Sequence, residues 1–299
     1  MDQSSLYDDK KLNSPPIRKS GGDASISIVM TAYNAEDLID KAIESVLNQS
    51  FSDFKFIIVN DGSTDNTRSI ICSYKDNRIQ LIDNGHDYIQ SLNTGLRSAN
   101  GKYLARMDAD DICHIDRLKI QHTIMEKNPE ITVCCCLMNI FGEKVSVGLF
   151  RQNYSGLIES PLVQLLLNDF VVNPSTMIRN SFLKEHNLLY EEYTFAEDYK
   201  FWAEAAMLDA IFYLESQPLV YKRIDKSQVS IKHRDAQIKT SSKIKKEILY
   251  FLCEKYKKYP ALESLSNTFY ELLDEQLISE GDLIKLFYTL LINNKDKLT

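Results

Sequence analysis

Short apolar runs alternate with amphipathic segments along the first third of the chain. Four of these runs have the length of buried strands: residues 26–30, 54–59, 78–82 and 103–107. Three segments between them repeat apolar side chains every three or four positions, which predicts helices: residues 38–47, 67–74 and 88–99. Strands and helices that alternate in this way are typical of right-handed crossover units, which build a mostly parallel sheet.

Polar clusters directly follow three of the predicted strands. They comprise residues 31–34 (Thr-Ala-Tyr-Asn), 61–63 (Asp-Gly-Ser) and 108–111 (Asp-Ala-Asp-Asp). Ligands of parallel α/β sheets bind just beyond the carboxyl ends of the strands. We therefore expect the three clusters to share one edge of the sheet and to form a binding site there.

The pattern is looser after residue 111. It predicts helices at 116–127 and 157–167 and from about residue 197, and extended segments at 131–138, 175–178 and 211–214. From residue 235 onward nearly every segment has the pattern of an amphipathic helix, most clearly at 243–256. These changes predict an α/β domain that ends near Ser230 and a helical region after it.

Composition narrows the class of protein. The net charge of −7 argues against a dedicated nucleic-acid binder, because such proteins concentrate Lys and Arg. A phosphate ligand remains compatible with this charge if a cation is recruited to mask it. The six cysteines show no zinc or disulfide spacing, which predicts reduced, mostly buried thiols in a cytosolic protein. No apolar stretch reaches the ~18 residues of a membrane span, and residues 1–24 have the polarity of a flexible tail.

The acidic segment 108–111 is the strongest candidate for a metal site. Asp108, Asp110 and Asp111 offer the hard oxygen ligands that Mg²⁺ and Mn²⁺ prefer. A divalent ion there would bridge diphosphate oxygens and stabilise charge on a leaving nucleotide. The alternative is a solvated loop in which Asp111 caps the next helix.

The two other clusters at the strand ends suit a nucleotide. Thr31, Tyr33 and Asn34 offer an aromatic ring for stacking and two short polar groups. Asp61 could accept hydrogen bonds from a base or a ribose. Simple turn roles compete with these interpretations, because Asn34 and Ser63 are also common helix caps.

An acidic pair opens the helix predicted from residue 197. Glu197 and Asp198 could complement the helix dipole, or one of them could deprotonate a hydroxyl group if burial and the neighbouring charge raise its basicity. His233 could approach a metal from the boundary region, although a solvent-exposed histidine is the simpler interpretation.

Taken together and in order, these motifs resemble the inverting, nucleotide-sugar-dependent glycosyltransferases of family 2, which have the GT-A fold. The resemblance covers residues 25–230. The matching segments are residues 27–34, 59–65, 84–85, 92–95, 99–103, 106–111 (which begins with Arg106) and 197–202. The departures are mild: Ala32 replaces a frequent proline, and Asn60 replaces a frequent aspartate.

The resemblance implies a role for each donor-site residue. Thr31 and Tyr33 would contact the nucleotide base, with Asn34 beside them in the same turn. Asp61 would hydrogen-bond the uracil edge of a UDP-sugar, and Asp108 would face the ribose or the sugar.

The resemblance also implies the catalytic groups. Asp110 would hold Mn²⁺ or Mg²⁺, and Asp198 would be the base. The acceptor hydroxyl would attack the anomeric carbon opposite the leaving nucleoside diphosphate, and the configuration would invert.

The resulting prediction has three parts: a tail at 1–24, a GT-A domain at 25–230 and a helical region at 231–299. Residues 25–111 would bind the nucleotide and residues 112–230 the acceptor, a glycan or lipid-linked hydroxyl in polysaccharide or surface-glycan biosynthesis. The alternatives are a sugar nucleotidyltransferase, against which the lack of glycine in residues 31–36 counts, and a non-catalytic nucleotide-sugar-binding module.

The helical region leaves two interpretations open. Its lysines, interleaved with apolar residues, suit peripheral contact with the inner face of the cell membrane, where lipid-linked acceptors are presented. We favour a helix that packs on the catalytic domain or on a second copy of the chain, in a cytoplasmic protein.

Overall fold

The computed structural model describes residues 24–142, 145–150, 155–167, 169–224 and 232–256, with a few single positions between 279 and 289. Its strands are β1 (Ile26–Ala32), β2 (Phe54–Asp61), β3 (Ile79–Asn84), β4 (Tyr103–Asp108), β5 (Ile112–Cys113), β6 (Val133–Gly142), β7 (Val145–Phe150), β8 (Gly156–Leu157), β9 (Met177–Arg179) and β10 (Phe212–Arg223). Its helices are α1 (Ile39–Leu47), α2 (Thr67–Ser73), α3 (Tyr88–Ser98), α4 (Arg117–Lys127), α5 (Pro161–Leu167), the 3-10 turn η2 (Asn173–Ser175), α6 (Asn180–His186), α7 (Glu197–Met207) and α9 (Arg234–Tyr256).

One mixed sheet runs through the molecule in the order β3-β2-β1-β4-β9-β6-β10-β5, with β7 on β6 and β8 on β10. The first four strands in this order are parallel. Strand β9 runs antiparallel to both β4 and β6 and so joins this half to the second half. The predicted parallel crossover half is confirmed, and the antiparallel strands belong to the part where the sequence pattern was loose.

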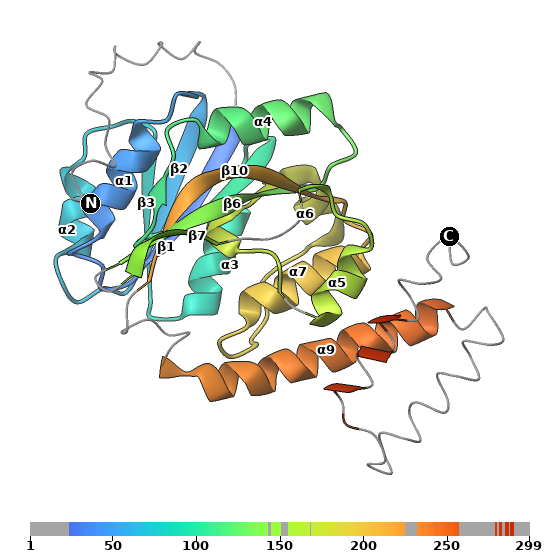
Figure 1. The fold of residues 1–299 in the computed structure, drawn as a ribbon. Helices are drawn as coiled ribbons and strands as arrows, with labels where there is room; N and C mark the ends of the chain where they lie inside the picture. Colours follow the sequence, from blue (N-terminus) through green and yellow to red (C-terminus); the bar gives the residue numbers. More distant parts are fainter. Residues whose placement is uncertain are drawn as a thin grey trace.

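Helices cover both faces of the sheet (Figure 1). Strand β1 shows why, because its alternate side chains point to opposite faces. Ile26, Ile28 and Met30 pack with α1, α2 and α4. Val29 packs on the other face, in the cluster that includes α3, α5 and α7. The central strand is therefore buried on both sides, as its continuous apolar run predicts.

Helix α3 approaches β1 unusually closely at Gly95. A Cβ atom at this position would lie 2.3 Å from a methyl group of Val29, well inside van der Waals contact. The absence of a side chain lets the helix settle on the sheet and fixes its first turn near the carboxyl end of β2.

The structure differs from the sequence prediction mainly in short elements. β5, β8 and β9 have two or three residues each, and the seven-residue helix α6 was not predicted. The helix predicted at 157–167 begins at Pro161, because residues 156–157 pair with β10. The extended segment predicted at 211–214 continues to Arg223 through two register shifts around Pro218. The boundary predicted near Ser230 lies outside the described residues.

The long helix α9 packs against α5 and α7 (Figure 1). Its buried side chains belong to the same core cluster as the sheet: Ile244, Ile248, Leu249 and Leu252. The described part of the helical region therefore buries these four side chains on the domain that precedes it. Within the described residues, no helix has both the length and the apolar character that a membrane crossing requires.

Four of the cysteines are buried as free thiols, as the sequence predicted: Cys113, Cys134, Cys135 and Cys136. Cys72 is a free thiol at the surface.

Candidate active site

Strand register brings the three polar clusters to one edge of the sheet. On β1, Thr31 pairs with Asp108 of β4, and Ala32 pairs with Asn60 of β2. All three strands are parallel, so their carboxyl ends meet, and the expectation of a shared edge is confirmed. The central position of β1 makes this edge the point where the chain order reverses, with β2 on one side and β4 on the other.

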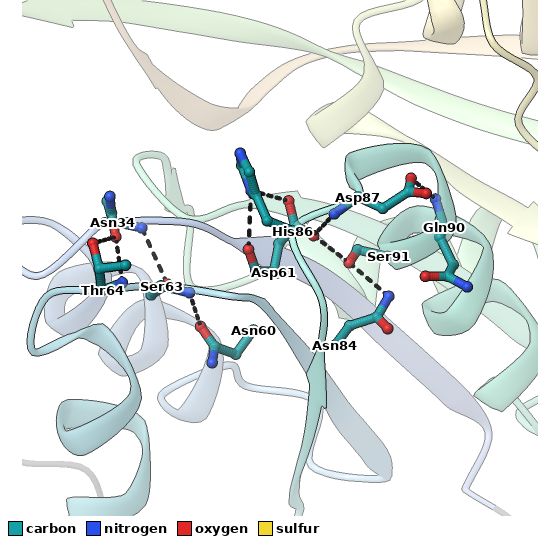
Figure 2. Close-up of polar contacts among 10 residues, drawn as sticks. All are labelled: Asn34, Asn60, Asp61, Ser63, Thr64, Asn84, His86, Asp87, Gln90 and Ser91. Carbon is teal, nitrogen blue, oxygen red and sulfur yellow. Dashed lines mark hydrogen bonds and ion pairs between the residues drawn. The ribbon is translucent and has the colours of Figure 1, made fainter.

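Asn34 links the turn after β1 to the turn after β2 (Figure 2). Its backbone N–H donates to the Ser63 hydroxyl over 3.1 Å, and its side-chain oxygen accepts from the Thr64 N–H over 2.8 Å. Asn34 adopts the left-handed conformation, with φ 45°. The N-cap of α1 is Leu38 and that of α2 is Asn66, so neither Asn34 nor Ser63 has the helix-cap role considered from the sequence.

Asp61 is buried at the end of β2 and is held by the start of α3. One carboxylate oxygen accepts from the Asp87 N–H over 2.9 Å and from the Ser91 hydroxyl over 2.7 Å (Figure 2). Its other oxygen lies 3.4 Å from Nδ1 of His86. The next residue, Gly62, has φ 72°, a conformation that favours glycine at this tight turn. Asp61 is thus fixed in place beside the turn after β1.

The ring of Tyr33 stacks on the ring of His86, with centroids 4.1 Å apart and planes 22° from parallel. Tyr33 is 45% exposed, so the stacked pair lies at the surface of the site. The sequence analysis missed His86. Its only sequence signal is its position directly after the motif at residues 84–85, because the contact with Tyr33 depends on two loops far apart in the chain.

The acidic segment forms a compact carboxylate cluster. One oxygen from each of Asp108, Asp110 and Asp111 lies within 4.8 Å of the others. Asp111 is fully buried. One of its oxygens accepts from the Arg223 N–H over 2.9 Å. The other, Oδ2, has no hydrogen-bond partner among the described residues and lies 4.0 Å from Nζ of Lys222.

Asp111 therefore ties the acidic segment to β10, and the alternative in which it caps the next helix is wrong. The N-cap of α4 is Asp116. Burial raises the pKa of Asp111 well above its ordinary value; Lys222 opposes the increase, and Asp110 and Asp108 add to it. A divalent cation would reduce the repulsion among the three carboxylates, and the buried Oδ2 of Asp111 could coordinate it. The cluster therefore fits such an ion.

Arg106 lies on β4, two residues before Asp108, and is 2% exposed. Its guanidinium donates to the carbonyl oxygen of Val29 over 3.0 Å and lies 3.8 Å from a carboxylate oxygen of Asp108. The Thr31 hydroxyl, on the neighbouring strand, is buried and has no hydrogen-bond partner within the part of the chain that the structure describes. Arg106 therefore places a buried positive charge beside Asp108.

Glu197 and Asp198 form the first turn of α7 and approach the acidic segment. Burial raises the pKa of Glu197 to about 7, and the charge of Asp198 adds to the increase. Burial also raises the pKa of Asp198, with a further increase from Asp108. A carboxylate of raised basicity close to the carboxylate cluster has the property that a general base requires.

Two further residues near this pair were missed by the sequence analysis. Tyr88 is 45% exposed, yet surrounding protein and then the charge of Asp108 raise the pKa of its phenol. Asp169 is also exposed, and surrounding protein and then the charge of Asp198 raise its pKa well above the ordinary value. Asp169 lines a cavity together with Asp198.

The loop before α7 is held by the start of α9. Phe195 has φ 61°, which is uncommon for a residue with a large side chain, and its ring stacks on His233 with centroids 4.3 Å apart. The side-chain amide of Gln237 donates to the carbonyl oxygen of Phe195 over 2.9 Å. His233 is exposed and lies on this ring, outside the carboxylate cluster. The structure therefore agrees with the simpler interpretation of His233, a solvent-exposed histidine.

Comparison with known proteins agrees with this geometry. The model of "Glycosyl transferase family 2" matches residues 27–187, more than half of the chain. An uncharacterised glycosyltransferase of Haemophilus influenzae is 37% identical over 242 residues, which cover 76% of this chain and 74% of that protein.

Two further matches extend the comparison. The Escherichia coli enzyme WfgD, a UDP-Glc:alpha-D-GlcNAc-diphosphoundecaprenol beta-1,3-glucosyltransferase, is 37% identical over 110 residues, 36% of this chain and 43% of WfgD. Among solved structures, Staphylococcus aureus TarS in complex with UDP-GlcNAc superimposes with a TM-score of 0.60 at 17% identity, over 79% of this chain and 74% of that one. This likeness confirms the expected GT-A fold.

Proposed function

The chain belongs to glycosyl transferase family 2, and we propose that it is an inverting enzyme that transfers a sugar from a UDP-sugar to a hydroxyl group of a glycan or lipid-linked acceptor. The observation that carries the proposal is the convergence of two groups of carboxylates. Asp108 of the acidic segment lies close enough to the Glu197-Asp198 pair of α7 for its charge to raise the pKa of both carboxyl groups.

The donor nucleotide would lie over the ends of β1 and β2. Tyr33 presents a half-exposed ring for base stacking, and Asp61 is an immobilised acceptor for the N–H groups of a uracil edge. His86 covers the Tyr33 ring. A base that stacks on Tyr33 would therefore displace the His86 ring or insert between the two rings. The UDP-sugars in the names of WfgD and of the TarS complex support this choice of donor.

The diphosphate would lie over the acidic segment. Asp110 and Asp111 would hold a divalent cation, Mn²⁺ or Mg²⁺, which would neutralise charge on the leaving diphosphate when bound. Asp108 would face the ribose or the transferred sugar, with the buried positive charge of Arg106 beside it. The buried Oδ2 of Asp111, which has no hydrogen-bond partner among the described residues, supports this assignment over one in which Asp110 acts alone.

Asp198 would act as the base. Its carboxylate would take the proton of the acceptor hydroxyl while the oxygen forms a bond to the anomeric carbon. The bond from that carbon to the diphosphate oxygen breaks, and its electron pair leaves with the nucleoside diphosphate. Attack from the face opposite the leaving group inverts the configuration. The raised pKa of Asp198 supports this role, because a stronger base accepts the proton more readily.

The acceptor class rests on the relatives. WfgD is named for a lipid-linked diphosphate-sugar acceptor, and its match covers 36% of this chain. We propose the same broad class here: a hydroxyl of a growing glycan, with or without a lipid carrier.

The proposal is tested by separating transfer from binding. We expect Asp198→Asn to reduce turnover of a UDP-sugar panel by at least a hundredfold, because the amide cannot accept the proton. UDP binding, followed by thermal shift with Mn²⁺, should stay within about threefold of the wild type. Retained transfer would show that another group is the base. A wild type that binds UDP but consumes no donor, even by hydrolysis, would indicate a non-catalytic binding module.

The cation role has its own test. We expect Asp110→Asn to weaken UDP binding in the presence of Mn²⁺. In the presence of a chelator, where UDP binds the wild type more weakly, the variant should bind UDP as the wild type does. An identical response of wild type and variant to Mn²⁺ would exclude Asp110 as a ligand. Asp116→Asn, which changes an aspartate outside the carboxylate cluster, is the matched control.

A further inference from the structure

A cavity of about 360 Å³ lies between the start of α7 and helix α9. Its volume falls within the range of roughly 300–1,000 Å³ typical of small-molecule sites. Its polar lining comes from three parts of the chain: Asp169, Asp198, Gln237, Ser241, Ser242 and Lys245. Four of these residues lie on α9, beyond the segment that the family model matches.

Asp198 connects this cavity to the donor side. Asp198 lines the cavity, and the charges of Asp108 in the acidic segment and of Lys222 on β10 also influence its carboxyl group. A hydroxyl group held in the cavity would therefore lie next to the proposed base.

Helix α9 holds the base-bearing segment as well as lining the cavity. Glu247 accepts from the Tyr193 hydroxyl over 2.6 Å and from Nζ of Lys200 over 2.8 Å. The contacts of His233 and Gln237 with Phe195 fix the same loop from the other end. The cavity wall and the base are thus parts of one rigid arrangement, which a site for a precisely oriented hydroxyl needs.

We propose that this cavity binds a neutral sugar unit of the acceptor, and that Asp169, Ser241 and Ser242 recognise its hydroxyl groups. This inference rests on the proposed function and adds the identity of the acceptor site. Helix α9 then contributes to acceptor choice.

The charges of the lining favour a neutral sugar over a phosphate. The two acidic side chains of the lining offer an anion no positive charge, whereas each carries oxygens that can accept hydrogen bonds from sugar hydroxyls. The single lysine is already engaged, since Nζ of Lys245 donates to the carbonyl oxygen of Leu167 over 2.8 Å. Ile238, which is 54% exposed, adds an apolar surface for the C–H face of a pyranose ring.

The test fills the cavity without touching the donor site. Ser241→Trp places an indole in the cavity, and Lys239→Trp, an exposed position on the same helix, is the matched control. The probes are p-nitrophenyl glycosides of glucose, galactose and N-acetylglucosamine, followed by saturation-transfer NMR with and without UDP and Mn²⁺. We expect wild type and control to bind at least one glycoside, and Ser241→Trp to weaken that binding at least tenfold. Asp169→Asn, a milder change, should weaken it severalfold.

The outcomes separate this inference from the proposed function. Glycoside binding that is equal in Ser241→Trp and wild type, or absent from the wild type, would overturn the cavity assignment. Pyrophosphate binding in chelator that Ser241→Trp removes would overturn the neutral-sugar occupant. If neither the wild type nor any variant bound UDP, the proposed function would be contradicted. The comparison of glycoside binding without UDP would still show whether the cavity binds a sugar.

Discussion

Two carboxylates of the acidic segment have different surroundings. Asp108 is partly exposed beside Arg106, whereas Asp111 is buried against β10, and one of its oxygens has no hydrogen-bond partner among the described residues. Residue type and spacing alone could not distinguish them, and the sequence analysis considered Asp111 as a helix cap. The backbone N–H of Arg223, more than a hundred positions along the chain, fixes its actual role.

The raised pKa of Glu197 predicts how the stability of the protein depends on pH. Its pKa is raised from 4.5 to about 7 by burial and by Asp198, so the folded protein holds this proton more tightly than the unfolded chain. Stability contributed through this group therefore falls as pH rises from about 4.5 to 7, and the penalty is constant above pH 7. We expect Glu197→Gln to raise the free energy of unfolding at pH 8 by on the order of 1–3 kcal/mol and to have little effect at pH 4.5.

The measurement is urea unfolding in chelator at a series of pH values. Glu185→Gln, at an exposed position on α6, is the control and should leave the wild-type profile unchanged. A Glu197→Gln difference that does not vary with pH would contradict the assigned titration.

At the scale of elements, one buried arginine ties the acidic strand to its neighbours. Arg117, at the start of α4, is fully buried. Its guanidinium donates to the carbonyl oxygens of Arg106 over 2.8 Å and Thr176 over 3.1 Å, and to Oε1 of Gln121 over 3.1 Å. These bonds join α4, β4 and the segment after η2, and they fix the strand from which Asp108 extends.

Replacement of this arginine should not be conservative. We expect Arg117→Lys to lower the free energy of unfolding by about 2–4 kcal/mol, because a single ammonium cannot reach both carbonyl oxygens and the amide that the planar guanidinium spans. Urea unfolding measures the change, with Arg97→Lys, an exposed position on α3, as the control. A loss below about 0.5 kcal/mol would show that the buried network is not the support described.

The elements also show where sequence reasoning reaches its limit. Regular periodicity and strand-end clusters predicted the parallel half and its binding edge, because both are local properties of the chain. The course of β10 through Pro218 was not predictable in this way, since its pairing with β6 is set by tertiary contacts. His86 and Asp169 were missed for the same reason: each belongs to the site only through a partner distant in sequence, Tyr33 and Asp198 respectively.

At the scale of the whole molecule, α9 shares one hydrophobic core with the sheet. Ile248 is fully buried in the cluster that also contains Trp202 and Phe212. Ile238, on the same helix, is exposed. The helix therefore contributes to the stability of the catalytic domain and does not behave as an appended unit.

We expect Ile248→Ala to lower the free energy of unfolding by about 2–5 kcal/mol in a single transition, because a large buried side chain is removed from the shared core. Ile238→Ala should change it by less than about 0.5 kcal/mol. Tryptophan fluorescence reports on the core through Trp202, and circular dichroism reports on the helices. Two separated transitions, with Trp202 unaffected by the first, would show that α9 unfolds independently.

The late position of α9 in the chain has a consequence for biosynthesis. The apolar surfaces of α5 and α7 that it covers are translated before it, so a ribosome-bound chain exposes them until Leu252 and its neighbours have emerged. Exposed apolar surface of this kind is a target for chaperones and a source of aggregation. A truncated messenger RNA that ends before this helix would therefore yield a chain that contains every proposed donor-site residue but has an exposed, aggregation-prone core.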